Sequence, residues 1–118
     1  MTAFNPPRKR KREKRENNRE FPAHRRFVKG HRCCIPGCLQ TPIEFAHLRT
    51  AANSGTGLKP PDWYGIPLCR QHHAMAHSKG HDQLGVDLEF LFKTASWLAW
   101  QSPDKKMRMA MKEVIDGR

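Results

Sequence analysis

Long apolar segments are missing from the sequence. No run of about 18 apolar residues occurs, so we expect no transmembrane helix and no membrane partner. Residues 1–12 lack the hydrophobic stretch of a secretory signal, which favours a cytosolic (cytoplasmic) location. Only 37% of the 118 residues are hydrophobic, so the chain can bury a modest core. Domains with a small core often depend on a bound metal for stability.

Acidic residues are also scarce. Asp and Glu number 11 against 22 Lys and Arg, which gives a formal net charge of +11 and favours a polyanionic partner such as DNA. Residues 1–30 hold 11 of the basic residues and 3 glutamates, so we expect a basic, largely disordered arm there. The arm is interpreted either as a solvated tail or as a phosphate-binding segment. Its expected phosphate contacts are Arg8, Lys9, Arg10, Lys11 and Arg12.

Cysteine occurs four times, and in a reducing cytosol metal binding is favoured over disulfides. Structural zinc prefers four thiolate or imidazole ligands in a tetrahedron. Cys34 and Cys38 form one pair on a short knuckle, and Cys69 and His72 form a second pair at the start of an expected helix. We therefore predict a structural zinc ion (Zn²⁺) held by these four residues, with Cys33 as the alternative to its neighbour Cys34.

Periodicity divides the rest of the chain. Apolar residues recur at helical spacing in residues 84–116, where we expect two helices, the second capped by Ser102. Turn-forming residues are frequent before that point, so regular elements there must be short. We predict strands at 41–48 and 63–68, a long loop at 49–61 and a helix at 70–78. The expected organisation is an arm (1–30), a central module (31–82) and a C-terminal helical segment (83–118).

Three histidines outside the zinc pair carry further chemistry. His73 and His77 are four residues apart and share one helix face, so they can chelate a divalent ion. His72 points about 100° away from His73, so these neighbours can serve two different metals. His47 ends the first expected strand, and a histidine beside a metal is a candidate general base for activating water.

The order of these motifs resembles the HNH endonucleases, and more narrowly the phage and prophage type akin to the Ref nuclease. The resemblance covers about residues 33–81 and implies a small α+β protein with a ββα-metal (His-Me finger) core, a zinc knuckle and flanking C-terminal helices. It rests on Cys-x3-Cys, Ala46-His47-Leu48-Arg49, the stretch GTGLKPPD at 55–62, Pro67-Leu68-Cys69 and the histidines at 72, 73 and 77.

The resemblance also implies roles for individual residues. His47 takes the place of the general base, while His73 and His77 take the places that hold a catalytic divalent ion such as Mg²⁺. Asp62 is nearest to the position that is usually asparagine, where it would orient the base or ligate the metal. Many family members carry a metal ligand where this chain has Ala46. The ion would then depend on water, Asp62, Glu44 or the substrate phosphate.

The expected function is metal-dependent hydrolysis of DNA phosphodiester bonds with low sequence specificity. Arg49 and Lys59 flank the site and are interpreted as phosphate contacts or as ordinary loop charges. RNA as the substrate, a homodimer, and a phage or recombination protein partner all stay open. The rival interpretation is a zinc-stabilised nucleic-acid-binding module without catalysis, which Ala46 favours. A classical zinc finger is excluded because it has about twelve residues between its ligand pairs.

Overall fold

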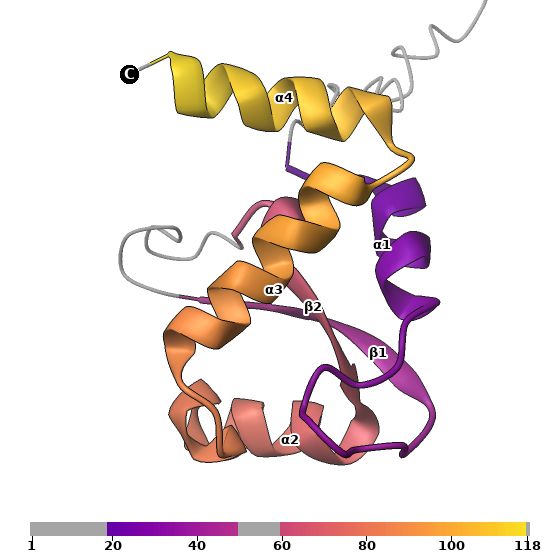
Figure 1. Cartoon of the computed structure of the whole chain (residues 1–118), viewed down its shortest axis with the longest axis vertical. Coiled ribbons are helices and arrows are strands. Elements are labelled where there is room, and N and C mark those ends of the chain that lie inside the picture. Colours follow the sequence, from indigo (N-terminus) through magenta and orange to yellow (C-terminus); the bar gives the residue numbers. More distant parts are fainter. Residues whose placement is uncertain (1–18, 50–59, 118) are drawn as a thin grey trace, which may run out of the picture.

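A two-stranded antiparallel sheet lies at the centre of the structure. The computed structural model describes residues 19–49 and 60–117. Strand β1 (Ile43–His47) pairs with β2 (Gly65–Cys69), and His47 lies opposite Gly65. Helix α2 (Arg70–Lys79) follows β2 directly (Figure 1). The predicted small α+β class is confirmed, with four helices and one two-stranded sheet in the described ranges.

Strand β1 is shorter than the predicted strand at 41–48. Strand β2 begins later than the predicted 63–68, because the chain forms a turn just before it. Residues Asp62–Tyr64 form a 3-10 turn, η1, in which Asp62 and Trp63 are buried. All five residues of β2 are buried, since the strand is covered by α1, α2 and α3. Pro67 is tolerated inside this strand because a two-stranded sheet leaves one side of β2 without a strand partner.

Helix α1 (Pro22–Lys29) lies within residues 1–30, the segment expected to be a basic, largely disordered arm, and was not predicted there. The helix packs on both strands (Figure 1). His24 and Val28 on this helix are buried. Pro22 suits a first helical position because its fixed backbone angle fits the helix and its missing N–H is not needed. The helix was not predicted from the sequence, because the segment is highly charged and only a few of its residues form an apolar face.

Helices α3 (Leu88–Gln101) and α4 (Lys105–Asp116) complete the fold. Leu91 and Ala95 of α3 join the core built on the sheet. Ala99 of α3 joins Met107 and Met111 of α4 in a second cluster that also contains Phe21 and Trp63. A short 3-10 turn, η2 (His81–Leu84), connects α2 to α3.

The cap of α4 differs from the prediction. Asp104 caps this helix, and its carboxylate accepts a hydrogen bond from the Met107 N–H at 3.0 Å. Ser102 instead follows the last residue of α3. Its hydroxyl oxygen accepts from the Asp104 N–H at 3.1 Å and lies 2.9 Å from His24 Nδ1, so it is already engaged.

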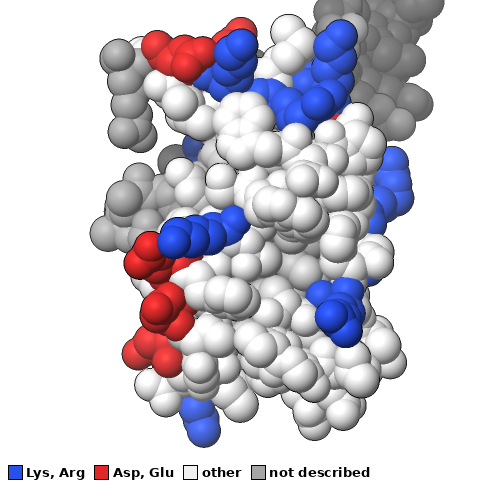
Figure 2. Space-filling model, in the orientation of Figure 1, with Lys and Arg blue, Asp and Glu red and all other residues white. Residues whose placement is uncertain are grey.

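The surface over α3 is poor in charge. Figure 2 shows few charged side chains at the centre of this face, and Trp97 and Trp100 are both exposed. In the part of the chain that the structure describes, no helix is long and apolar enough to span a membrane.

Docking of α4 is tested by truncating the buried methionine. Met107 is 0% exposed, so Met107→Ala should lower the free energy of unfolding by about 2–5 kcal/mol. Met109 lies two positions along the same helix and is 58% exposed, so Met109→Ala should stay within about 0.5 kcal/mol of wild type. Denaturant unfolding followed by circular dichroism measures both. Equal losses would contradict the described docking of α4.

Candidate functional site

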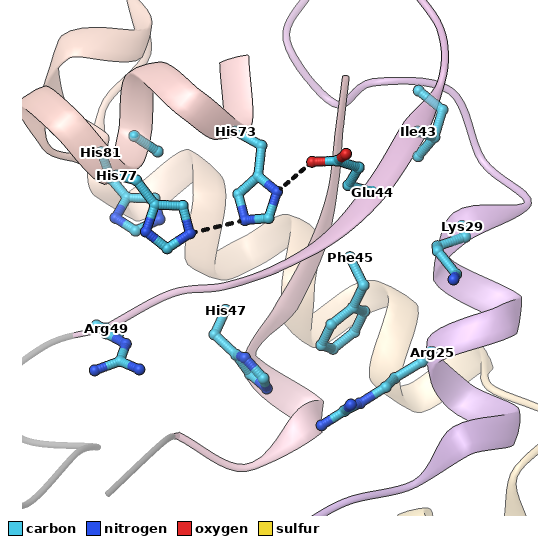
Figure 3. A pocket seen from close by; sticks show the side chains of 11 residues that line it. Arg25, Lys29, Ile43, Glu44, Phe45, His47, Arg49, His73, His77 and His81 are labelled. Carbon is cyan, nitrogen blue, oxygen red and sulfur yellow. Dashed lines mark hydrogen bonds and ion pairs between the residues drawn. The ribbon is translucent and has the colours of Figure 1, made fainter. Parts of the chain in front are cut away.

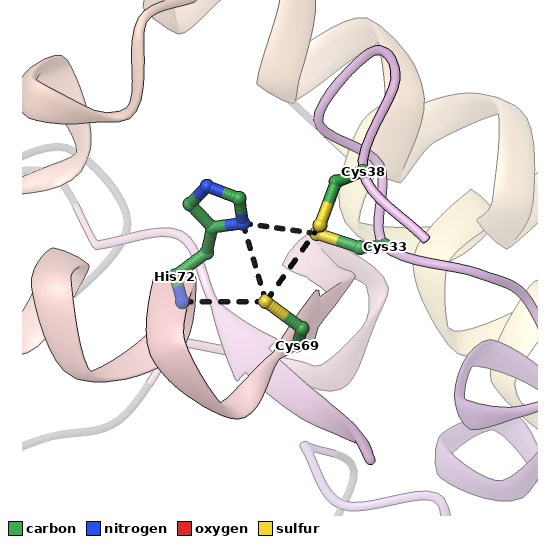
Figure 4. Close-up of side chains that lie close together, drawn as sticks. All are labelled: Cys33, Cys38, Cys69 and His72. Carbon is green, nitrogen blue, oxygen red and sulfur yellow. Dashed lines mark hydrogen bonds between the residues drawn. The ribbon is translucent and has the colours of Figure 1, made fainter. Parts of the chain in front are cut away.

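The side chains of three cysteines and one histidine meet where β2 leads into α2. Cys33 and Cys38 come from the knuckle before β1, while Cys69 ends β2 and His72 lies in the first turn of α2 (Figure 4). Their sulfur and nitrogen ligand atoms all lie within 4.8 Å of one another. All four cysteines of the chain are free thiols. This cluster can therefore hold a metal ion.

The spacing of these atoms matches a tetrahedral zinc site. Zinc bonds of about 2.3 Å to sulfur and 2.0 Å to nitrogen give sulfur–sulfur edges of about 3.8 Å and sulfur–nitrogen edges of about 3.5 Å. Cys38 Sγ lies 3.9 Å from Cys69 Sγ. His72 Nδ1 lies 3.4 Å from Cys33 Sγ and 3.2 Å from Cys69 Sγ. The donor set and its dimensions are consistent with structural zinc.

Cys33, not the favoured Cys34, occupies the fourth position. The sulfur of Cys33, and not that of Cys34, belongs to the group of ligand atoms within 4.8 Å of one another, and it lies 3.4 Å from His72 Nδ1. The backbone N–H of Cys34 donates to the Pro67 carbonyl at 2.9 Å, which anchors the knuckle to β2. Burial raises the pKa of the Cys34 thiol to about 12, so this group stays protonated at neutral pH. Sequence spacing alone could not show which of these two neighbouring cysteines is the ligand.

A second group of histidines lines an open pocket of about 620 Å³ on another side of α2. His47 stands on β1, and His73 and His77 stand on α2 across the pocket from it (Figure 3). His72 and His73 thus face different sites, as their helical spacing predicts. The structure brings His47, His73 and His77 to one pocket and keeps the cysteine cluster separate.

Asp62 holds the imidazole of His47. Its Oδ1 lies 2.9 Å from His47 Nε2 and accepts from Arg25 Nη2 at 2.9 Å. Its Oδ2 accepts from Arg25 Nε at 2.7 Å and from the Phe21 backbone N–H at 2.6 Å. The carboxyl group is fully buried, and each oxygen already has two partners. Of the two roles expected for Asp62, these contacts fit the orienting of His47.

The surroundings of Asp62 keep it ionised. Burial alone would raise its pKa, but hydrogen bonds from His47, Arg25 and Phe21 outweigh burial and hold the pKa below its ordinary value of 3.8. An ionised carboxylate only accepts hydrogen bonds, so His47 Nε2 carries the proton. In the neutral imidazole the lone pair is then on the other ring nitrogen, Nδ1.

His73 and His77 form a candidate chelate. Their Nε2 atoms lie 3.1 Å apart. Two ligands in adjacent octahedral positions at about 2.1 Å from a metal are separated by about 3.0 Å. His73 Nδ1 donates to Glu44 Oε1 at 2.8 Å, which leaves the lone pair of this imidazole on Nε2. Glu44 therefore orients His73, and hydrogen bonds from His73 and Arg70 lower the pKa of Glu44.

Three charged or titratable residues of the pocket were not singled out from the sequence: Arg25 and Lys29 on α1, and His81 on η2. Arg25 and Lys29 are four residues apart and share a helix face. This spacing was overlooked because the segment was interpreted as part of a disordered arm. His81 follows His77 by four residues. Burial lowers the pKa of His81, and the nearby His77 and His73 lower it further, against the opposing effect of the His47 carbonyl.

The remaining predicted phosphate contacts divide into two groups. Arg49 lines the pocket beside His47 (Figure 3). Six others lie outside the described residues: Arg8, Lys9, Arg10, Lys11, Arg12 and Lys59.

Comparison with models of known protein families, with curated proteins and with solved structures gave no match to the chain.

Removal of one ligand tests the cysteine cluster. Cys33→Ser should weaken zinc binding by more than about 100-fold, because even the residues that orient metal ligands are worth 10–100-fold in affinity. Cys34→Ser is the matched control, and both it and wild type should bind about one zinc ion per chain. Elemental analysis after dialysis gives the metal content, and a chelator should lower the melting temperature of wild type. The reverse result, with zinc lost only from Cys34→Ser, would refute the assignment.

Acid should remove the stabilisation that Asp62 supplies. Asp62→Asn leaves Arg25 without its charged partner and should cost about 3 kcal/mol at neutral pH. The folded-state pKa of Asp62 lies below the ordinary 3.8, so its contribution is present above about pH 4 and is lost as the pH falls below that. The difference in unfolding free energy between wild type and Asp62→Asn should therefore shrink below pH 4. Any metal contribution is common to both proteins and cancels in this difference. A gap that stays constant down to pH 2 would show that Asp62 is not the titrating group.

Proposed function

We propose that this protein is a metal-dependent endonuclease of the HNH type that hydrolyses phosphodiester bonds of DNA. One observation carries the proposal: the imidazole of His47, oriented by a buried carboxylate, stands across a pocket from the paired imidazoles of His73 and His77. The order of two antiparallel strands and a helix that carries these groups agrees with a ββα-metal core.

His47 would act as the general base. Asp62 fixes the imidazole proton on Nε2, so Nδ1 can take a proton from a water molecule in the pocket. The resulting hydroxide would attack phosphorus in line with the 3′ oxygen, the bond between phosphorus and that oxygen would break, and a water molecule would protonate the leaving oxygen to give the 3′-hydroxyl. His47 is 16% exposed at its side chain, which leaves it reachable from the pocket while its ring rests edge-on against Phe45.

His73 and His77 would hold a catalytic divalent ion through their facing Nε2 atoms. A divalent ion there supplies positive charge that offsets the negative charge growing on the phosphate and the leaving oxygen. Glu44 keeps the His73 lone pair directed at that position. Water and the substrate phosphate would complete the coordination, because Ala46 offers no ligand.

The charge of the pocket suits a polyanionic substrate. Lys29 and Arg49 line the pocket together with Arg25. No ion pair joins Lys29 or Arg49 to an acidic residue within the described ranges. Both cations can therefore bind phosphate oxygens. With a net charge of +11, binding should weaken as salt is added.

A second candidate is a zinc-stabilised nucleic-acid-binding module without catalysis. It is favoured by the number of metal ligands: among the described residues, only the cysteine cluster brings three or more ligand atoms within 4.8 Å. The histidine pair alone is a weaker chelate than that cluster.

Nicking of supercoiled plasmid separates these two functions. Wild type should nick the plasmid in the presence of Mg²⁺, Mn²⁺ or Zn²⁺, and EDTA should abolish nicking. His47→Ala should lose at least about 100-fold in rate through loss of the general base. His73→Ala should lose a comparable factor, which excess metal partly restores.

His31→Ala is the matched control, because His31 lies outside the histidine pocket and its Nδ1 bonds the Phe27 carbonyl oxygen. It should nick at the wild-type rate. DNA binding in a gel-shift assay without nicking under any metal would favour the non-catalytic module. Full activity of both His47→Ala and His73→Ala would refute the assigned site.

A further inference from the structure

Arg25 reaches the proposed base through one intermediate. Its guanidinium binds both oxygens of Asp62, at 2.7 Å from Nε and 2.9 Å from Nη2. Asp62 Oδ1 in turn contacts His47 Nε2 at 2.9 Å. The Arg25 guanidinium also lies over the Phe45 ring, 5.4 Å from its centroid, and Phe45 packs edge-on against His47 at 4.9 Å. Helix α1 is therefore linked to His47 in two ways, through Asp62 and through Phe45.

We propose that Arg25 is a positioning residue for His47: its two-pronged hold on Asp62 keeps that carboxylate ionised and fixed, and so keeps the imidazole proton on Nε2. The inference rests on the proposed function for the role of His47 as a base. The inference adds a residue of α1 to the site. This helix lies before all the motifs on which the family resemblance rests.

The physical reason lies in the burial of Asp62. A carboxyl group with 0% exposure tends to take up a proton unless cations and donors stabilise its charge. A protonated Asp62 could donate to His47 Nε2, which would move the imidazole proton to Nδ1. The lone pair would then face Asp62 instead of water, and the base would be blocked. Arg25 prevents this reversal, since its fixed positive charge lies against both oxygens.

Other charged or titratable groups near His47 cannot take over this task. His81 on η2 contacts the backbone carbonyl of His47 and not Asp62. His73 and Glu44 pair with each other, and His77 with His73. Arg49 and Lys29 line the pocket, but no contact of theirs with Asp62 occurs in the described structure.

The test removes the charge of Arg25 while keeping most of its stem. Arg25→Gln should lower kcat for cleavage of a short DNA duplex by about 10- to 100-fold, with KM changed less than about twofold, because positioning of the base is lost. Arg25→Lys retains the charge and one hydrogen bond, so it should recover part of kcat. Arg26→Gln makes the same change one position along α1, on an exposed residue outside the pocket, and should behave as wild type.

A spectroscopic measurement tests the same claim without cleavage. Imidazole ¹⁵N shifts of the full chain, assigned with His47→Ala, should report His47 as the Nε2–H tautomer in wild type, in Arg25→Lys and in Arg26→Gln. Arg25→Gln should show an increased share of the Nδ1–H tautomer. This readout holds even if wild type does not nick DNA, so failure of the nuclease proposal is distinguishable from failure of this one.

Three outcomes would overturn the inference. One is an Arg25→Gln protein with wild-type kcat and an unchanged His47 tautomer. Another is a rise in KM alone, which would make Arg25 a phosphate contact. The third is a loss of activity that follows the unfolded fraction, with the His47 tautomer unchanged in the folded molecules.

Discussion

The buried carboxylate of Asp62 is the contact on which the pocket depends. It joins three segments that are far apart in the sequence: the start of α1, the end of β1 and the turn before β2. A buried charge is tolerated only when its partners are in place, so these segments must assemble together. The same contact that stabilises the fold also orients His47, which couples stability to the chemistry of the pocket.

Helix α2 contributes histidines to two separate sites, because neighbouring residues of a helix point in different directions. His72 turns toward the cysteines, while His73 and His77 turn toward the pocket. A metal ion at the cysteine cluster would fix the first turn of α2 to β2 and the knuckle. That fixed turn would set the direction of the neighbouring His73, because one rigid backbone carries both histidines. A structural ion can thus support a second site that it does not touch.

The pocket holds imidazoles in defined orientations. Each of two histidines has one nitrogen against a carboxylate: His47 against Asp62 and His73 against Glu44. Both carboxylates have pKa values below their ordinary range, so both act as hydrogen-bond acceptors at neutral pH. The remaining lone pair of each imidazole is therefore on the nitrogen that does not contact the carboxylate. For His73 that lone pair meets His77, and for His47 it is available to water.

The short-range parts of the fold and site could be predicted from the sequence. The spacing of His73 and His77 placed them on one face of a helix, and the pairing of Cys69 with His72 is seen in the cluster. Periodicity and turn residues predicted the individual strands and helices, and the resemblance implied the α+β class. These features depend on residues within a few positions of one another, where the geometry of a helix or turn fixes the outcome.

Only the tertiary structure decided which distant side chains meet. It selected Cys33 over Cys34, gave Asp62 its partners, and brought α1 with Arg25 and Lys29 to the pocket wall. Sequence spacing carries no information on contacts such as that of Arg25 with Asp62, which are 37 residues apart. They are set by how α1 packs on the sheet, and that packing depends on the whole core.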